Sequence, residues 1–593
     1  MFRNKRYVIF IALLVCLVIA GIATYVYTQR IKPLVEGELK AFIQKSTQNL
    51  YQVTFQDISF NLWTGSAQLT NIRFYPDTSV YNQQILNETA PNNLYYIQLE
   101  KLSIDRFRPW SMYFKKEAKI KRLTFEQPQI HMVNKQFAFN ENLPPKPRKS
   151  PYAYISKFFK SLQIQEIVFK QARVQYTDRN SETEQVDSLN NLNVTLTDWL
   201  IDAHSAKDTS RIYLVKDVKI NLDNYQYATP DSLYFIKVNQ LDFHLKAGKV
   251  HIKKFNLEPR YSAFEFGTRS GFAKDHFLIN LNDLLIHGID LHAYISKQHF
   301  IAQRVEILDG RVHVQNDNRF PKKIQDRTGR FPHQLLQQLS TKIKVDSIQL
   351  QNIDVSYAEF DRDSQQAGKV SFENTKGLLK HVGNLDPNQV MEAQIETYVM
   401  GQGKMWVNFQ FNRFDPKGGF NYQGKLTNLD GKTLNQITKP LGMLQINRAQ
   451  INELAFDITA NSDRALGTLD FRYKDLSVAL LKKEVGKERL VRQGWLSFLA
   501  NNLVINGDNP NVEGQYTQAK INYKRETTAS FFNFIWKSLF QGVKHSVGLT
   551  LAKELEIQRQ IARFEKLKEN REERKENREE RKIKREIRKS KRQ

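Results

Sequence analysis

The most restrictive feature of the sequence is an apolar spacing that recurs along much of the chain. Hydrophobic residues fall at offsets 0, 3, 5, 8, 10 and 12 in residues 164–176 (IQEIVFKQARVQY) and again in residues 345–357 (VDSIQLQNIDVSY). Steps of two keep side chains on one face of a β-strand, whereas a step of three moves them to the other face. Either a β-bulge restores the face, or the chain bends between two short strands. Both arrangements predict a strongly coiled sheet with one apolar face and one polar face.

The spacing belongs to a larger internal duplication. Residues 97–107 (IQLEKLSIDRF) match residues 279–289 (INLNDLLIHGI) at an offset of 182. In both copies the flanking strands, a proline-containing basic loop and a short helical segment follow in the same order. Residues 55–176 and 238–357 are therefore interpreted as two copies of one β-rich unit, which is the sequence signature of a repeat architecture.

Together these patterns predict a mainly β protein. An N-terminal transmembrane helix should precede a long, strongly twisted repeat sheet shaped like a groove, with a few short helices, a C-terminal amphipathic helix and a charged tail that is helical or disordered. The predicted division is 1–27 for a cytoplasmic stub and transmembrane anchor, 28–50 for an amphipathic helix, 51–230 and 231–389 for the two β-repeat units, 390–525 for a C-terminal β region, 526–552 for an amphipathic helix and 553–593 for the charged tail.

Residues 7–27 form an uncharged stretch that is long enough to cross a membrane. As a helix its 21 residues would extend about 31 Å, close to the thickness of a bilayer core. Basic residues precede it, so the N-terminus is expected in the cytoplasm and the remaining chain beyond the membrane. A cleaved signal peptide is the alternative, with small residues at Gly21 and Ala23. Cys16 is the only cysteine, so no intrachain disulfide can form.

The charge of the chain favours anionic partners. Lys and Arg number 88 against 62 Asp and Glu, a formal net charge of +26, of which +7 lies in residues 553–593, +3 in the first six residues and +16 is spread over the body of the chain. On the far side of a membrane, anionic lipid headgroups are more plausible partners than nucleic acid, and no nucleic-acid partner is expected. The repeated charged segment 568–588 lacks an apolar seam, so it is interpreted as a solvated helix or a disordered arm, with a binding element as the alternative.

The apolar face of such a sheet needs a cover, because the helices expected within residues 51–525 are few and short. The sheet must either fold over and fill its own interior or form a trough for another molecule. In the trough interpretation the face is lined for the acyl chains of phospholipids. The predicted lining consists of Phe60, Leu62, Leu69, Phe74, Leu123, Phe125, Ile130, Phe169, Val174, Phe243, Ile252, Ile307, Val312, Leu350 and Val355.

Residues 530–555 return to helical spacing with a wide apolar face. One interpretation is a helix that caps the open edge of the sheet. The other is a helix at a membrane interface, with aromatic side chains in lipid and lysines in water. The predicted membrane-facing residues are Phe531, Phe532, Ile535, Trp536, Leu539 and Phe540.

No motif for catalysis, cofactor binding or metal binding is present in the sequence. Residues 401–406 (GQGKMW) lack the spacing of a phosphate-binding loop, and neither HExxH nor a serine elbow occurs. His287 and His292, in the densest histidine group, would lie on opposite faces of a strand. The sequence therefore gives no reason to expect an enzyme, a cofactor or a metal site.

The order of features resembles the AsmA-like family of Gram-negative envelope proteins, which is related to TamB and to bridge-like lipid-transfer proteins. The resemblance rests on the single N-terminal span, on residues 53–74 (VTFQDISFNLWTGSAQLTNIRF) as the first strands, and on residues 118–133 (AKIKRLTFEQPQIHMV) followed by 137–144 (FAFNENLP). Residues 469–481 (LDFRYKDLSVALL) and the 530–555 helix resemble the C-terminal part of Bacteroidetes-type members.

This resemblance implies a single-pass protein of the bacterial inner membrane with its bulk in the periplasm. A β-sheet groove would carry phospholipids between membranes or otherwise support outer-membrane biogenesis, and the C-terminal region would contact the outer membrane or envelope proteins. No catalytic residue is implied. The alternative function is a filled β-scaffold that recruits envelope proteins without transporting lipid.

Overall fold

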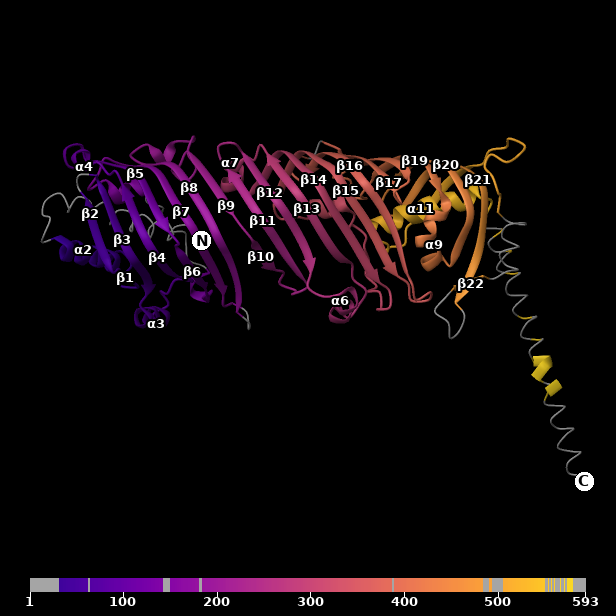
Figure 1. The fold of residues 1–593 in the computed structure, drawn as a ribbon, viewed down its shortest axis with the longest axis horizontal. Coiled ribbons are helices and arrows are strands. Elements are labelled where there is room, and N and C mark those ends of the chain that lie inside the picture. Colours follow the sequence, from indigo (N-terminus) through magenta and orange to yellow (C-terminus); the bar gives the residue numbers. More distant parts are fainter. Residues whose placement is uncertain are drawn as a thin grey trace, which may run out of the picture.

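The computed structural model shows a mainly β protein built around one very long sheet (Figure 1). It describes residues 31–61, 64–141, 150–180, 184–386, 389–483, 490–492 and 505–549, with isolated positions between 553 and 579. Strands account for 54% of the residues and helices for 19%, and 22 strands join in a single mixed sheet. The predicted mainly β class is thereby confirmed. The predicted anchor at residues 7–27 lies outside the described residues.

The strands follow one another along the sheet in chain order. They are β1 (Tyr51–Thr54), β2 (Asp57–Asn61), β3 (Ser66–Pro76), β4 (Asn93–Asp105), β5 (Glu117–Glu126), β6 (Gln129–Asn134), β7 (Ser161–Asp178), β8 (Gln185–Ile201), β9 (Asp217–Leu222), β10 (Tyr225–Ala228), β11 (Tyr234–His244), β12 (Lys249–Pro259), β13 (His276–His287), β14 (His299–Asp317), β15 (Lys342–Phe360), β16 (Ala367–Gly383), β17 (Met391–Val399), β18 (Gly403–Phe411), β19 (Phe420–Asp430), β20 (Leu444–Ala460), β21 (Arg464–Lys483), β22 (Leu490–Arg492) and β23 (Gln518–Lys524). The short β22 pairs with the end of β21.

The helices are short and lie mainly in the connections between strands. They are α2 (Ile31–Ser46), α3 (Thr78–Leu86), α4 (Pro109–Lys115), α5 (Pro151–Ile155), α6 (Ala263–Ser270), α7 (Leu291–Lys297), α8 (Pro332–Gln337), α9 (Asn435–Gly442) and α11 (Phe531–Ser546). Helices α2 and α11 fall within the amphipathic segments expected at residues 28–50 and 526–552.

The two copies found in the sequence have the same order of elements. The series β3, α3, β4, α4, β5 with β6, α5 and β7 is repeated as β12, α6, β13, α7, β14, α8 and β15. In both copies the last strand is parallel to its predecessor, because β7 pairs in parallel with β5 and β6, and β15 pairs in parallel with β14. A parallel neighbour requires the chain to cross back, and the connections containing α5 and α8 make that crossing. Pairing continues through β10–β11 and β16–β17, so the predicted units share one sheet.

β-Bulges explain the three-residue steps in the apolar spacing. In β7 the register shifts between Phe169 and Ala172, and the residue before Ala172, Gln171, has a φ of 51°. In β15 the register shifts between Leu350 and Ile353, and Asn352 has a φ of 48°. The corresponding residues of β3, β11 and β13 are also left-handed, namely Asn71, Gln240 and Asp283. The inserted residue returns the next apolar side chain to the same face and increases the local twist.

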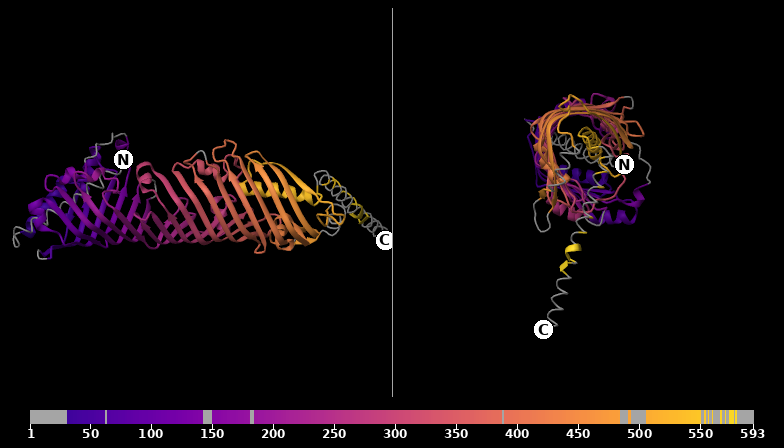
Figure 2. Two further views of the ribbon diagram at one scale, coloured as in Figure 1. Left: turned by 90° about the horizontal axis from the view of Figure 1, so that it is seen from above. Right: turned by 90° about the vertical axis from the view of Figure 1, so that its right-hand side faces the viewer.

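The repeated bulges accompany a pronounced curvature of the sheet. Viewed along the long axis, the strands curve around a concave side, and α11 lies inside that curve (Figure 2). The two ends of the sheet lie far apart, with the N-terminal strands β1–β4 at one end and the C-terminal strands β19–β23 at the other (Figure 1). The concave side is therefore the candidate location of a functional site.

Gln171 offers a test of the bulge. Left-handed backbone costs a β-branched residue about 1–2 kcal/mol but costs glycine little. We expect Gln171→Val to increase hydrogen exchange of the β7 amides by about tenfold, and Gln171→Gly to leave it unchanged or slower.

Gln175 is the matched control, because it lies in the regular part of the same strand, opposite Ser188. There the order should reverse, with Gln175→Gly exchanging faster than Gln175→Val. The same ranking of valine and glycine at both positions, measured by mass spectrometry, would contradict this account of the bulge.

Candidate functional site: the concave apolar face

One row of apolar side chains crosses almost the whole sheet. Each of its residues is the register partner of the next, so all of them lie on the same face. We call it the central row: Ile58, Leu69, Leu102, Phe125, Phe169, Val194, Ile220, Phe243, Val250, Ile286, Val305, Ile348, Leu379, Ala393, Phe409, Tyr422, Ile458, Gly467 and Ile521. At a strand spacing of roughly 4.8 Å the row is on the order of 90 Å long.

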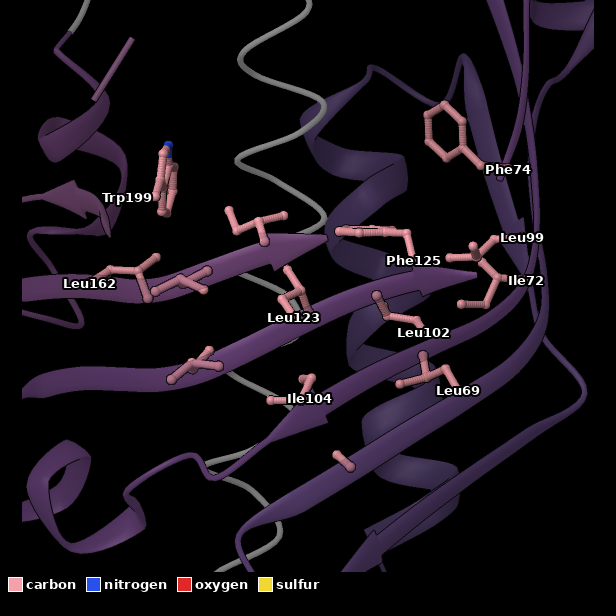
Figure 3. Packing of buried hydrophobic residues seen from close by; sticks show 14 of the residues in the cluster. Leu69, Ile72, Phe74, Leu99, Leu102, Ile104, Leu123, Phe125, Leu162 and Trp199 are labelled. Carbon is pink, nitrogen blue, oxygen red and sulfur yellow. The ribbon is translucent and has the colours of Figure 1, made fainter. Parts of the chain in front are cut away.

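At the N-terminal end the concave face is packed by protein. Leu69, Leu102 and Phe125 are buried in a large cluster that also includes residues from α2 and α5 (Figure 3). Phe125 stacks on Phe169 with ring centroids 4.5 Å apart. The side chains in this part of the row therefore form an ordinary core.

At the C-terminal end, α11 covers the same face. The Tyr422 and Ser538 hydroxyl oxygens are 2.6 Å apart and fully enclosed. Gly542 allows the helix to approach closely, because a Cβ there would lie 3.0 Å from the Leu469 side chain. Phe531 and Phe534 complete the contact by packing against Phe420 of the sheet and Phe331, the residue that precedes α8. Small residues on one side of α11 thus fit it into the curve of the sheet.

Between these ends the central row is only half-buried. From Phe169 in β7 to Leu379 in β16 no residue of the row is buried, although each has an apolar side chain. A second row with the same property runs beside it through Leu241, Ile252, Leu284, Ile307 and Leu350. Among the described residues, the one core cluster confined to this stretch is small and lies at the sheet edge, around Phe266. The middle of the concave face is therefore apolar but incompletely covered.

The predicted lining residues are divided by this pattern. Leu69, Phe74, Leu123 and Phe125 are packed in the N-terminal cluster. Leu62 lies outside the described residues, as does the side chain of Phe60 in β2. The half-buried members of the predicted lining are Ile130, Phe169, Val174, Phe243, Ile252, Ile307, Val312, Leu350 and Val355. A lining role remains a prediction for all of them, and the half-buried set is where it has physical support.

The predicted membrane-facing residues of α11 lie on different sides of the helix. A second large cluster of buried side chains, which we call the C-terminal cluster, includes Phe411, Tyr422 and Ile458. Phe531 of α11 is buried in it, and Ile535 and Leu539 are partly buried against it. Phe532, Trp536 and Phe540 are 75%, 55% and 41% exposed and form a stripe along the opposite side. The helix therefore combines contact with the sheet and an exposed aromatic stripe, and its role at a membrane interface remains a prediction.

The convex face is polar. Cross-strand ion pairs such as Arg122–Glu166 at 2.6 Å and Lys425–Glu453 at 2.7 Å lie on it. Exposed pairs of this kind add little stability individually, so their main effect is to keep this face hydrated.

In the part of the chain that the structure describes, no group of three or more His, Cys, Asp or Glu side chains is placed to hold a metal ion. None of the helices described is long and apolar enough to span a membrane. The sequence matches no protein-family model and no curated protein. The concave face is therefore the feature of the described structure that bears on function.

A buried histidine makes the C-terminal cluster sensitive to pH. His333 of α8 is fully buried, 5.0 Å from the Phe411 ring by centroid distance, and neither of its nitrogens has a hydrogen bond of normal geometry. Burial lowers the pKa of His333 to about 4, although the backbone of Gly418 and the Asp415 carboxylate oppose the shift.

This pKa predicts a loss of stability on acidification. Between pH 6.5 and about 4 the unfolded chain protonates His333 while the folded chain does not, so lowering the pH favours unfolding. The contribution to the free energy of unfolding should fall by about 2–3 kcal/mol over this range. We expect His333→Phe to flatten this pH dependence in denaturant titrations, whereas His292→Gln, at an exposed position, should not. An unchanged pH profile in His333→Phe would show that this histidine is not the cause.

Proposed function

We propose that this protein carries phospholipids along the middle of its concave apolar face, as a membrane-anchored periplasmic protein of outer-membrane biogenesis. The observation that carries the proposal is the half-buried stretch of the central row between Phe169 and Leu379. A protein that left so many apolar side chains partly hydrated without an occupant would forgo stability, at about 25 cal/mol for each Å² exposed. An acyl chain laid along the row would remove this surface from water.

The chemistry of a phospholipid suits the two faces of the sheet. Burying an acyl chain yields about 0.8 kcal/mol per CH₂, while the headgroup stays in water at the open side. The net charge of +26 adds attraction for anionic lipids. The predicted N-terminal anchor and the resemblance to AsmA-like proteins support a location between the inner and outer membranes. The proposal contains no catalytic step, cofactor or metal.

The two packed ends of the concave face limit how far a lipid could move along it. In this proposal acyl chains lie along the half-buried central strands, whereas passage along the row beyond Leu379 requires α11 to leave the concave face or the lipid to exit sideways. The aromatic stripe of Phe532, Trp536 and Phe540 would then be available at the end where lipid is delivered.

Leu350→Asp tests the proposal. A carboxylate in the second apolar row opposes the burial of an acyl chain, so phospholipid recovered with the purified full chain should fall roughly fivefold, as should transfer of fluorescent phospholipid between vesicles. Mass spectrometry of extracted lipid gives the first measurement.

Ser347→Asp is the matched control. It introduces the same charge in β15 on the convex face, where its register partners are Arg304 and Lys380, and lipid recovery should remain at the wild-type level. Equal recovery from both folded variants would contradict lipid carriage. If lipid is absent from the wild-type protein and crosslinks from the convex face capture envelope proteins, the filled-scaffold alternative is the better explanation.

A further inference from the structure

An open pocket of about 570 Å³ lies beside α6, at the edge of the half-buried stretch. Its lining combines cationic, anionic, hydroxyl, aromatic and aliphatic side chains, among them Arg269, Lys274, Asp231, Ser270, Tyr261 and Leu233. This volume is in the range of small-molecule sites. The pocket is thus a candidate for the polar part of a ligand whose apolar part lies elsewhere.

The pocket adjoins the concave apolar face through shared residues. Leu233 lines the pocket and forms a small cluster with Tyr234 and Phe266 of α6, and Leu257 of β12 packs against this cluster. Leu257 in turn begins a half-buried apolar row across β12 to β15, whose next members in register are Ile279, Val312 and Val355. A molecule with its head in the pocket can therefore lay its tail on the apolar face.

The pocket carries a net positive charge. The Arg269 guanidinium lies 3.9 Å from the centroid of the Tyr261 ring, which fixes its plane, and no carboxylate in the described part of the chain lies within ion-pair distance of it. Lys274 pairs with Asp231 at 3.5 Å, so Arg269 is the cation of the lining without a carboxylate partner in the lining. An acidic influence on it comes from Glu265, one turn earlier in α6, whose pKa is lowered by hydrogen bonds at the N-cap of the helix and further by Arg269, without an ion pair. A guanidinium held in one plane is suited to bidentate contact with phosphate oxygens.

The wall also contains an unused hydrogen-bonding group. The Ser270 hydroxyl is enclosed and has no hydrogen-bond partner in the protein. An enclosed hydroxyl without a partner is costly unless a ligand or water satisfies it. The Asp231 carboxylate, by contrast, accepts hydrogen bonds from the Thr229 hydroxyl at 2.6 Å and the Leu233 amide at 3.1 Å.

We propose that this pocket binds the phosphate of an anionic glycerophospholipid, with Arg269 as its main contact and the acyl chains on the adjoining apolar row. The proposal rests on the lipid-carrying function and adds a headgroup preference to it. A headgroup with one net negative charge matches the net charge of the lining better than a zwitterionic one. Free phosphate offers the same oxygens without the tail.

Calorimetric titration of the purified full chain in a non-ionic detergent tests the preference. The probes are dihexanoyl phosphatidylglycerol, dihexanoyl phosphatidylcholine and inorganic phosphate. Wild-type protein should bind the phosphatidylglycerol more tightly than the phosphatidylcholine. Arg269→Gln should lower affinity for the anionic lipid roughly tenfold and for the zwitterionic lipid less than about twofold. Arg311→Gln removes the same charge from an exposed position on the convex face and should change neither affinity.

Asp231→Asn is a second variant that distinguishes loss of the site from misfolding, because it should increase the affinity for phosphatidylglycerol. The amide oxygen can keep the contacts to Thr229 and Leu233, while Lys274 loses its competing carboxylate and becomes available to the ligand. We expect roughly a threefold gain for phosphatidylglycerol. A gain of this kind does not arise from damage to the fold.

The outcomes separate the two proposals. Equal affinity of the wild-type protein for both lipids, or an unchanged preference in Arg269→Gln, overturns the headgroup site and leaves lipid carriage intact. Inorganic phosphate binding as tightly as phosphatidylglycerol also overturns it, since the tail would then contribute nothing. Leu350→Asp should weaken the binding of both lipids without changing the ratio of their affinities, and a failure of both lipids to bind the wild-type chain would overturn lipid carriage itself.

Discussion

The fold depends on keeping the apolar side chains of every strand on a single side of the sheet. A sheet of this length has one residue per strand in each row, and a slip of one position in any strand would turn its apolar set toward water. The bulges at positions such as Gln171 and Asn352 preserve the alignment, because each adds the residue that a three-residue apolar step requires. Asparagine, aspartate and glutamine occupy these positions, and the first two tolerate left-handed backbone best among residues with a side chain. The same bulges twist and curve the strands, so alignment and curvature have a common cause.

Curvature alone does not cover the concave face, and the chain covers it unevenly. The N-terminal end is packed by helices and the C-terminal end by α11, where Ser538 and Gly542 permit close contact with the sheet. Between them α6, α7 and α9 contact strands β14 to β16, but the described residues form no core cluster comparable in size to those at the two ends. This contrast within one continuous apolar row is the reason for placing function in the middle. A uniformly packed row would favour a structural role.

Much of the fold could be predicted from the sequence because it repeats. The duplication and the apolar spacing predicted a long coiled sheet. They left open whether each three-residue step is a bulge or a bend, and the structure contains both. Gln171 forms a bulge inside β7, whereas Gln127, which is also left-handed, separates β5 from β6.

The site was less predictable from the sequence. Burial differs between Leu123 and Leu350 although both fit the same spacing, because it depends on helices that arrive from distant parts of the chain. Hydrophobic periodicity also overlooked the sheet-facing side of α11, since Ser538 and Gly542 contribute fit without hydrophobicity. The pocket beside α6 depends on Arg269 and Ser270, which occur in no recognisable motif.

The largely sequential pairing of the strands means that the sheet can be lengthened by adding strands. Each strand contacts mainly the strands before and after it in the chain, and the second copy of the β-rich unit is inserted into the sheet without disturbing the order of the first. A further copy would lengthen the sheet by one unit and leave the packing at its two described ends as it is. Gene duplication alone could thus change the length of such a sheet, with no redesign of either end.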